Sequence, residues 1–119
     1  MQTYCECTIT GIGSGALDFA DDRMLILFSN QAGNGLEEYS VQISTPQFQR
    51  DIKPGDTMYF GDNSYLVTAV GEKAMETFRL LGHCTLRFDG SDVAVLPGTI
   101  HVESSQLPPV IAGTKIIFC

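Results

Sequence analysis

The sequence predicts an all-β protein: a small closed or partly open barrel of about eight or nine short strands, with one short helix over about residues 72–81. Short segments alternate apolar and polar residues, turn residues separate these segments, and one stretch alone has helical spacing. Closing such a sheet removes its exposed edges, which favours a barrel or a sandwich. The 119 residues can build one hydrophobic core, so we expect a single domain over residues 1–119.

The first half of the chain contains three predicted strands. Residues 4–10 alternate, residues 24–28 are continuously apolar, as in a strand covered on both sides, and residues 39–44 alternate again. Residues 30–35 are a loop by composition. The alternation places these side chains on the apolar faces of their strands: Cys5, Cys7, Ile9, Tyr39, Val41 and Ile43.

A turn over residues 52–56 contains Pro and Gly, and residues 58–60 and 65–70 flank a Gly-Asp-Asn-Ser turn as a β-hairpin. The turn and the strand after it have an echo near the C-terminus, which indicates either a pseudo-symmetric barrel or chance convergence on common turn sequences. The two matching patterns are Ile52-x-x-Gly55-x-x-Met58-x-Phe60 and Val110-x-x-Gly113-x-x-Ile116-x-Phe118.

The predicted helix over residues 72–81 has Met75, Phe78 and Leu81 at a spacing of three, and Gly82 is a plausible stop. The remaining predicted strands cover residues 84–88, 93–96 and 99–102, and residues 110–119 close the chain with an apolar anchor, a Gly turn and a final strand.

Fourteen acidic residues against seven basic ones give a formal net charge of −7. Such a surface repels phosphate backbones and anionic lipids, so nucleic acid and membrane surfaces are poor partners, whereas a basic protein would suit it. The longest apolar run, residues 24–28, is far too short to span a bilayer, and no signal peptide is visible. We therefore expect a soluble, cytoplasmic protein without direct membrane insertion.

The four cysteines are Cys5, Cys7, Cys84 and Cys119. Cys5 and Cys7 are too close for the usual zinc knuckle, and they share a strand face with Ile9. We interpret them as core thiols, with a metal or disulfide role as the alternative. Acidic residues are concentrated in two places, where they could serve acid–base chemistry or hold a metal but are more often solvated surface. These residues are Asp18, Asp21, Asp22, Glu37 and Glu38.

Two histidines, His83 and His101, are the candidates for group transfer. An imidazole with an ordinary pKa near 6.5 is nucleophilic at neutral pH, so it can accept a phosphoryl group and pass it on. His83 follows the predicted helix, and His101 lies in the strand over residues 99–102. Spacing alone favours a structural role for each.

Several stretches together resemble a known family. The most specific is Leu81-Gly82-His83-Cys84-Thr85-Leu86-Arg87-Phe88-Asp89-Gly90, and two more are Leu66-Val67-Thr68-Ala69-Val70-Gly71 and Leu96-Pro97-Gly98-Thr99-Ile100-His101-Val102. With matching runs near the N-terminus, at residues 24–26 and at residues 52–55, the chain resembles the glucitol/sorbitol-specific enzyme IIA family of the bacterial sugar phosphotransferase system over almost its whole length.

The resemblance implies a cytoplasmic phosphocarrier that uses no cofactor. In this family a histidine accepts phosphate from the phosphocarrier protein HPr and passes it to a IIB unit, and membrane IIC components couple the transfer to hexitol uptake. The family pattern puts the acceptor histidine near Ile43, where this chain has none, and the hydroxyls of Ser44 and Thr45 are poor relays beside imidazole.

Two hypotheses follow. The chain is a phosphocarrier that uses His83, with His101 second, or it is a phosphotransfer-deficient paralogue that serves as a regulatory or protein-binding module. Exposed strand edges could pair two copies, so a homodimer is the expected oligomer if the protein self-associates.

Overall fold

The computed structural model describes residues 2–29 and 36–119, and within them the chain forms nine strands and one α-helix. The loop predicted over residues 30–35 lies outside the described residues. The strands are β1 (Cys5–Ile12), β2 (Met24–Phe28), β3 (Val41–Ile43), β4 (Gln47–Phe48), β5 (Thr57–Phe60), β6 (Asn63–Val70), β7 (Cys84–Arg87), β8 (Thr99–Val102) and β9 (Lys115–Phe118). The helix is α1 (Ala74–Leu81), and two 3₁₀ turns cover Ala20–Asp22 and Leu36–Tyr39.

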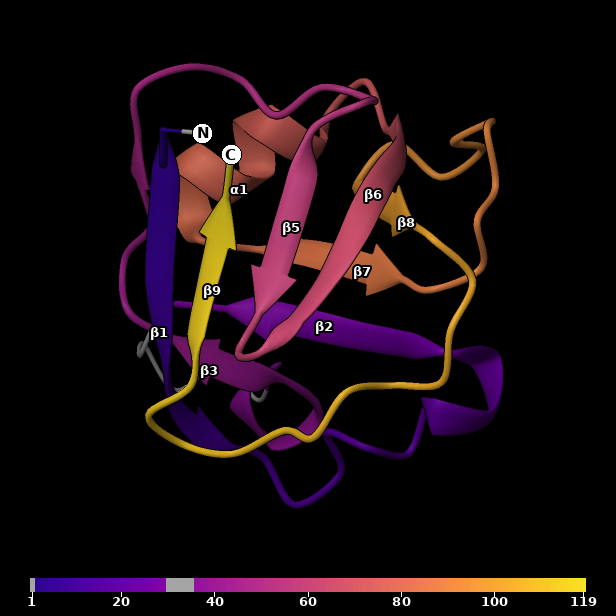
Figure 1. Cartoon of the computed structure of the whole chain (residues 1–119). Coiled ribbons are helices and arrows are strands. Elements are labelled where there is room, and N and C mark those ends of the chain that lie inside the picture. Colours follow the sequence, from indigo (N-terminus) through magenta and orange to yellow (C-terminus); the bar gives the residue numbers. More distant parts are fainter. Residues whose placement is uncertain (1, 30–35) are drawn as a thin grey trace.

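Eight of the strands close into a barrel. Their order is β3-β2-β7-β8-β6-β5-β9-β1, and β1 pairs back with β3, while β4 adds to the outer end of β1. The β2–β3 and β7–β8 pairs are parallel and the other pairs are antiparallel. In Figure 1 β1, β9, β5 and β6 form the near wall, and β2 and β7 cross behind them. The prediction of an all-β barrel with eight or nine strands and one helix is confirmed.

The barrel has an internal two-fold pseudo-symmetry. In one half β1 pairs with β3 through Ile9↔Ile43, with a register shift before the next pair, Gly11↔Gln42. In the other half β6 pairs with β8 through Val67↔Val102, with the same shift before Ala69↔His101. Each residue of the second set lies 58 or 59 positions after its counterpart in the first.

The same relation holds around the barrel. The two-fold exchanges β2 with β7 and β5 with β9. Its axis passes between the paired residues Ile26 and Thr85 of β2 and β7, and at the opposite wall between the paired residues Tyr59 and Ile117 of β5 and β9. The echo in the sequence therefore reflects a repeated structure rather than chance convergence.

The two echoed turns are equivalent corners of this barrel. Gly55 and Gly113 have nearly equal positive φ angles, 95° and 94°. The amide of Gly55 donates to the carbonyl of Val67, and the amide of Gly113 donates to the carbonyl of Ile9, each over 2.8 Å. Each corner thus leads into a strand that pairs with a long strand of the other half of the barrel: β5 pairs with β6, and β9 pairs with β1.

The barrel interior is filled by apolar side chains. Alternate residues of the strands point inward, and Phe60, Phe88, Phe118 and Met58 are fully buried there. Cys5, Cys7 and Cys84 are free thiols within this core, as interpreted for the first two. Burial raises the pKa of the Cys7 thiol to about 12, so it remains protonated and serves as a small apolar side chain.

Helix α1 covers one end of the barrel. Ala74 and Phe78 face the core, and the αL glycine Gly82 ends the helix as predicted. The predicted inward residue Leu81 is instead exposed, because the buried stripe follows the spacing of four between Ala74 and Phe78. Phe48 packs edge-on against Phe78 with ring centroids 5.1 Å apart, which explains the unpredicted strand β4 that carries it.

Two further sequence predictions are wrong. Residues 93–96 are a loop, not a strand, because β8 already pairs with β7 on one edge and with β6 on the other and leaves no edge free. Tyr39 is exposed at the end of a 3₁₀ turn, so the buried alternation starts at Val41. Within residues 2–29 and 36–119, no helix has the length and apolar character needed to cross a lipid bilayer.

The equivalence of the two corners predicts that a substitution at Gly55 and one at Gly113 destabilise the protein to a similar extent. Replacing Gly55 or Gly113 with Ala should each lower the free energy of unfolding by about 1–2 kcal/mol, because a Cβ is disfavoured at positive φ although there is open space around both sites. Gly98→Ala is the matched control, since its Cβ would also meet nothing but its φ is not positive, and it should change stability by less than about 0.5 kcal/mol. Urea denaturation measures all three, and an equal cost in the control would contradict the assignment of strain.

Candidate functional site

His101 lies in the middle of β8, whose four residues are all buried. The strand runs between β7 and β6, with Arg87 beside His101 on one side and Ala69 on the other. Only 5% of His101 is exposed. A buried imidazole needs a hydrogen-bond partner, because an unpaired polar group inside a protein is costly.

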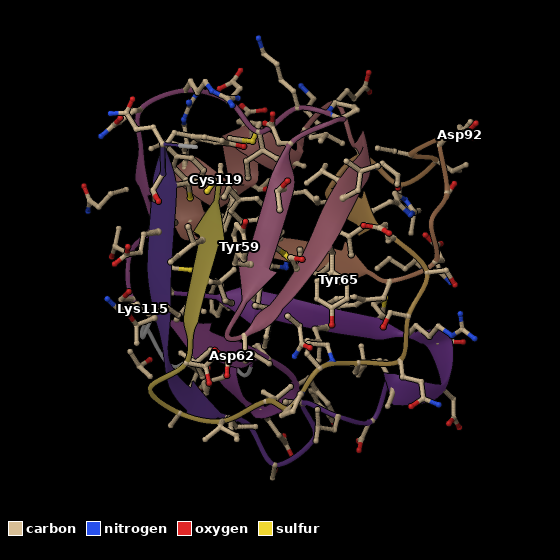
Figure 2. The ribbon with its side chains drawn as sticks, in the orientation of Figure 1. Tyr59, Asp62, Tyr65, Asp92, Lys115 and Cys119 are labelled. Atoms are coloured by element: carbon tan, nitrogen blue, oxygen red, sulfur yellow. The ribbon has the colours of Figure 1, made fainter. Side chains whose placement is uncertain are left out.

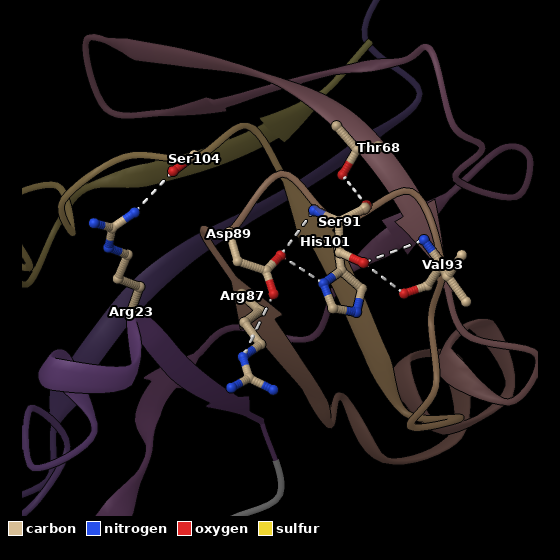
Figure 3. A network of polar contacts seen from close by, with 8 residues as sticks. All are labelled: Arg23, Thr68, Arg87, Asp89, Ser91, Val93, His101 and Ser104. Carbon is tan, nitrogen blue, oxygen red and sulfur yellow. Dashed lines mark hydrogen bonds and ion pairs between the residues drawn. The ribbon is translucent and has the colours of Figure 1, made fainter.

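Asp89 supplies that partner. After β7 the Phe88 side chain enters the core and the chain turns at Gly90, which has a φ of 69°. This turn brings the Asp89 carboxylate over β8, with Oδ1 2.7 Å from Nδ1 of His101 (Figure 3). The Ser91 amide donates to the same oxygen over 3.1 Å, and Arg87 Nε lies 3.6 Å from the other.

The electrostatics of this cluster keep Asp89 ionised. Partial burial raises the pKa of Asp89, but the hydrogen bonds from His101 and the Ser91 amide, with the charges of His101 and Arg87, outweigh it and hold that pKa below its ordinary value. An ionised carboxylate only accepts hydrogen bonds, so Nδ1 of His101 carries the proton. In the neutral ring the lone pair is therefore on Nε2.

Nε2 is turned away from Asp89, and His101 lines a pocket of about 160 Å³ (Figure 3). Polar groups in the wall of the pocket include Arg87 of β7 and Thr99 of β8, the two strands of the parallel pair. The outer rim is apolar and consists of Val93, Val95 and Leu96. A nucleophilic nitrogen, a guanidinium and a hydroxyl thus share one small cavity.

The other predicted histidine, His83, which the sequence placed first, has a different environment. Its amide closes the C-terminal turn of α1 by donating to the carbonyl of Thr77 over 3.2 Å, and its ring packs edge-on against Phe28 with centroids 5.7 Å apart. Partial burial lowers the pKa of His83. It precedes the start of β7, whereas His101 lies beside Arg87 at the end of that strand, so the two histidines do not form one site.

Ile43, the position implied for the acceptor, lies at the end of β3 with 1% of its surface exposed. It pairs with Ile9 of β1 and belongs to the core. Ser44 and Thr45 follow as exposed residues, and the Ser44 hydroxyl accepts a hydrogen bond from the Thr8 amide over 2.9 Å.

The pseudo-symmetry provides an internal comparison for the His101 site. Gln42 in β3 is the counterpart of His101, and Phe28 beside it in β2 is the counterpart of Arg87. Gln42 uses its side-chain amide to donate to the carbonyl of Glu37 over 3.2 Å. The barrel therefore has two equivalent positions, and one of them alone carries a histidine and an arginine.

The acidic residues do not build a site of their own. Asp18, Asp21, Asp22 and Glu38 are exposed and Glu37 is half-buried. Among the described residues, no three His, Cys, Asp or Glu side chains gather closely enough to bind a metal ion.

Asp89 and Arg87 were missed as functional residues by sequence reasoning. Both stand within the run that carries the family resemblance, but nothing in the sequence pairs them with a residue twelve or more positions later. Their signal is the placement of Asp89 at a strand end just before a glycine turn.

Comparisons with known proteins agree over nearly the whole chain. The model of the family described as "PTS system glucitol/sorbitol-specific IIA component" matches residues 4–117. The glucitol/sorbitol-specific EIIA component of Escherichia coli K12 is 39% identical over 118 residues, which cover 99% of this chain and 96% of that protein, and the Shigella flexneri protein of the same description matches to the same extent. The crystal structure of a PTS system IIA component from Enterococcus faecalis V583 has a TM-score of 0.80 and 30% identity, and the match covers 93% of this chain and 96% of that one.

The lowered pKa of Asp89 makes a prediction about stability. Because that pKa lies below the unfolded value of about 3.9, ionised Asp89 stabilises the fold above this pH, and the contribution is lost as the pH falls through the folded pKa. Asp89→Asn should therefore be less stable than the wild type at pH 7, and the gap should narrow as the pH falls through the folded pKa of Asp89.

Urea unfolding across this pH range measures the difference. Asp92→Asn is the control, because Asp92 is exposed and has no ion pair among the described residues, and it should match the wild type throughout. A gap between Asp89→Asn and the wild type that stays constant into acid would contradict the linkage.

Proposed function

The chain belongs to the PTS glucitol/sorbitol-specific IIA family, and from this membership we propose that it is a phosphocarrier whose phosphoryl group is held on Nε2 of His101. The observation that supports this choice is the 2.7 Å contact between Nδ1 of His101 and Asp89, which leaves Nε2 free in a pocket. His83 and Ile43 offer no comparable arrangement.

The chemistry follows from the tautomer. Nε2 attacks phosphorus in line with the donor atom; as the new P–N bond forms, the bond from phosphorus to the donor atom breaks, and the donor atom keeps the electron pair. The proton on Nδ1 stays on the ring throughout. The Asp89 carboxylate stabilises the positive charge that the ring gains when Nε2 is phosphorylated, and it acts as a positioning residue.

Two side chains are placed to bind the transferred group. The Arg87 guanidinium can pair with phosphoryl oxygens, for which its planar geometry is well suited, and the Thr99 hydroxyl can donate to another. Both line the pocket with His101 and are held in place by the parallel pairing of β7 with β8. The pocket is small, which suits a phosphoryl group better than a sugar.

The internal comparison also favours a functional role for His101. The equivalent position in the first half holds Gln42 beside Phe28, and that half of the barrel folds without a histidine or an arginine there. A buried histidine–aspartate pair is therefore not a requirement of this strand geometry.

We assign the partners by family. HPr would donate the phosphoryl group and a IIB unit would accept it, with the membrane IIC components moving the sugar, and the protein would act in the cytoplasm. The reaction needs no cofactor because the phosphoryl group arrives already activated.

Replacing His101 tests the proposal. The purified protein is incubated with phosphoenolpyruvate, enzyme I and HPr and analysed by intact mass, and the wild type should gain one acid-labile phosphate. His101→Gln should gain none, while its fold is preserved because glutamine occupies the equivalent position 42. His83→Ala is the control and should label like the wild type. Labelling of His101→Gln at the wild-type rate would exclude His101 as the acceptor.

A second candidate function is a regulatory or protein-binding module without phosphotransfer. The observation that favours it is the buried Ile43 at the position where the family resemblance implies the acceptor. It predicts that the wild type takes up no phosphate while a family member that carries the acceptor histidine labels in the same tube.

Ile43→His tests whether position 43 retains the surroundings of a phosphate acceptor or lacks them. In the His101→Gln background it should not restore labelling, and it should lower stability by about 2–3 kcal/mol, because the imidazole would be buried against Ile9 without a partner. Ile43→Val is the control, with an expected cost of about 1 kcal/mol. Recovery of labelling in Ile43→His would instead show that position 43 retains the surroundings of an acceptor.

A further inference from the structure

The loop over residues 91–98, between β7 and β8, exposes three aliphatic side chains beside the His101 pocket. Val93 is 61% exposed, Val95 83% and Leu96 56%, and together they form the apolar rim described above. Isolated apolar residues are common on protein surfaces, but three in one short loop form a patch that is typical of an interaction site.

The loop is held firmly in place at both ends. At its start the Thr68 hydroxyl donates to the carbonyl of Ser91 over 2.6 Å, and the Ser91 hydroxyl accepts from the Val93 amide and donates to the Val93 carbonyl (Figure 3). At its end the Lys73 amide donates to the carbonyl of Pro97 over 3.0 Å. The carbonyl oxygen of Pro97 also packs closely against Gly71, where an added Cβ would lie 2.2 Å from that oxygen.

This fixation has a consequence for binding. A loop that is already ordered loses little conformational entropy when a partner covers it, so its exposed side chains can contribute their full burial to affinity.

A second hollow lies on the other side of the same loop. Its volume is about 360 Å³, and Val95 lines both this hollow and the His101 pocket. The residues that line it include Val70, Pro54 and Pro97, which have apolar side chains, and the two acidic residues Glu72 and Asp92. Among the described residues neither carboxylate is in an ion pair. Figure 2 shows Asp92 at the outer end of the loop.

We propose that the apolar rim and this acidic hollow form one docking surface for the protein that delivers the phosphoryl group, and that the hollow receives an arginine or lysine of that partner. The stem of such a side chain packs on apolar walls while its charged head pairs with carboxylates. The partner must also present apolar side chains to cover Val93, Val95 and Leu96. The net charge of −7 adds a long-range attraction for a partner with a basic face.

This inference rests on the proposed function for the identity of the partner. The shared residue Val95 makes the docking surface continuous with the His101 pocket, so the partner that binds there is the one that exchanges the phosphoryl group. A protein seated on the rim would close the mouth of the pocket and exclude water from the transfer. The docking surface does not itself involve phosphate, so its binding to the partner can be tested separately.

The first experiment measures initial rates of phosphoryl transfer from phosphorylated HPr over a range of concentrations of this protein. Val95→Asp and the double variant Glu72→Lys with Asp92→Lys should each raise the half-saturating concentration about tenfold. In the double variant, whose two residues do not line the His101 pocket, the maximal rate should change by less than about twofold. Asp62→Lys is the matched control, an exposed charge reversal at the β5–β6 turn, well away from Asp92 in Figure 2, and it should behave like the wild type. Added salt should weaken transfer to the wild type more than to the double variant.

The second experiment titrates ¹⁵N-labelled protein with unphosphorylated HPr, which needs no transfer. Amide shifts should centre on residues 91–98 and on Glu72, and they should persist in His101→Gln. If the wild type accepts no phosphate but these shifts occur, the proposed function fails and the docking surface stands. Wild-type transfer kinetics in the docking variants, shifts centred elsewhere or no binding at all would each overturn the docking surface.

Discussion

Closure of the sheet by β1 is the constraint on which the rest of the structure depends. This strand pairs with β9 along one edge, and along the other it pairs with β4 at its start and with β3 from Ile9 onward, across its register shift. Once the barrel is closed, every barrel strand has neighbours on both edges, and a short strand such as β8 is buried on both faces. His101 therefore cannot meet water as a surface histidine would, and its ring is oriented by the carboxylate that the β7–β8 connection brings to it.

The two-fold pseudo-symmetry makes the chemistry of the two halves directly comparable. The parallel pairs β2–β3 and β7–β8 present the same backbone geometry, but Phe28 and Gln42 occupy one and Arg87 and His101 the other. A symmetric barrel can thus supply two positions with equivalent backbone geometry and carry polar side chains suited to a functional site at only one of them. This is possible because strand pairing fixes the backbone while the side chains are free to differ. Helix α1 and β4 also break the symmetry, since neither has a counterpart of its own kind in the other half.

Much of the fold could be predicted from the sequence because local patterns decide it. The continuous apolar run at β2, the alternation of β1 and the glycine after α1 each specify their element within a few residues. The loop over residues 93–96 was misassigned because its valines resemble a strand, and only the occupied edges of β8 exclude one. The site could be predicted only in part, because it too depends on how strands pair. His101 could be named from the sequence, but its pairing with Asp89 depends on the parallel register of β7 and β8, which no local pattern specifies.

The hydrogen bonds at the seam between β1 and β9 have a counterpart in the β5–β6 hairpin. Cys5 pairs with Phe118 across the seam, and the two-fold carries this pair onto Asn63 and Phe60, which flank the hairpin turn (Figure 1). The order of the strands along the chain is therefore a property of connectivity and not of the barrel. A circular permutant opened between Gly61 and Asp62 and joined from residue 119 to residue 2 by a short linker would retain every pairing, with the half that carries His101 synthesised first.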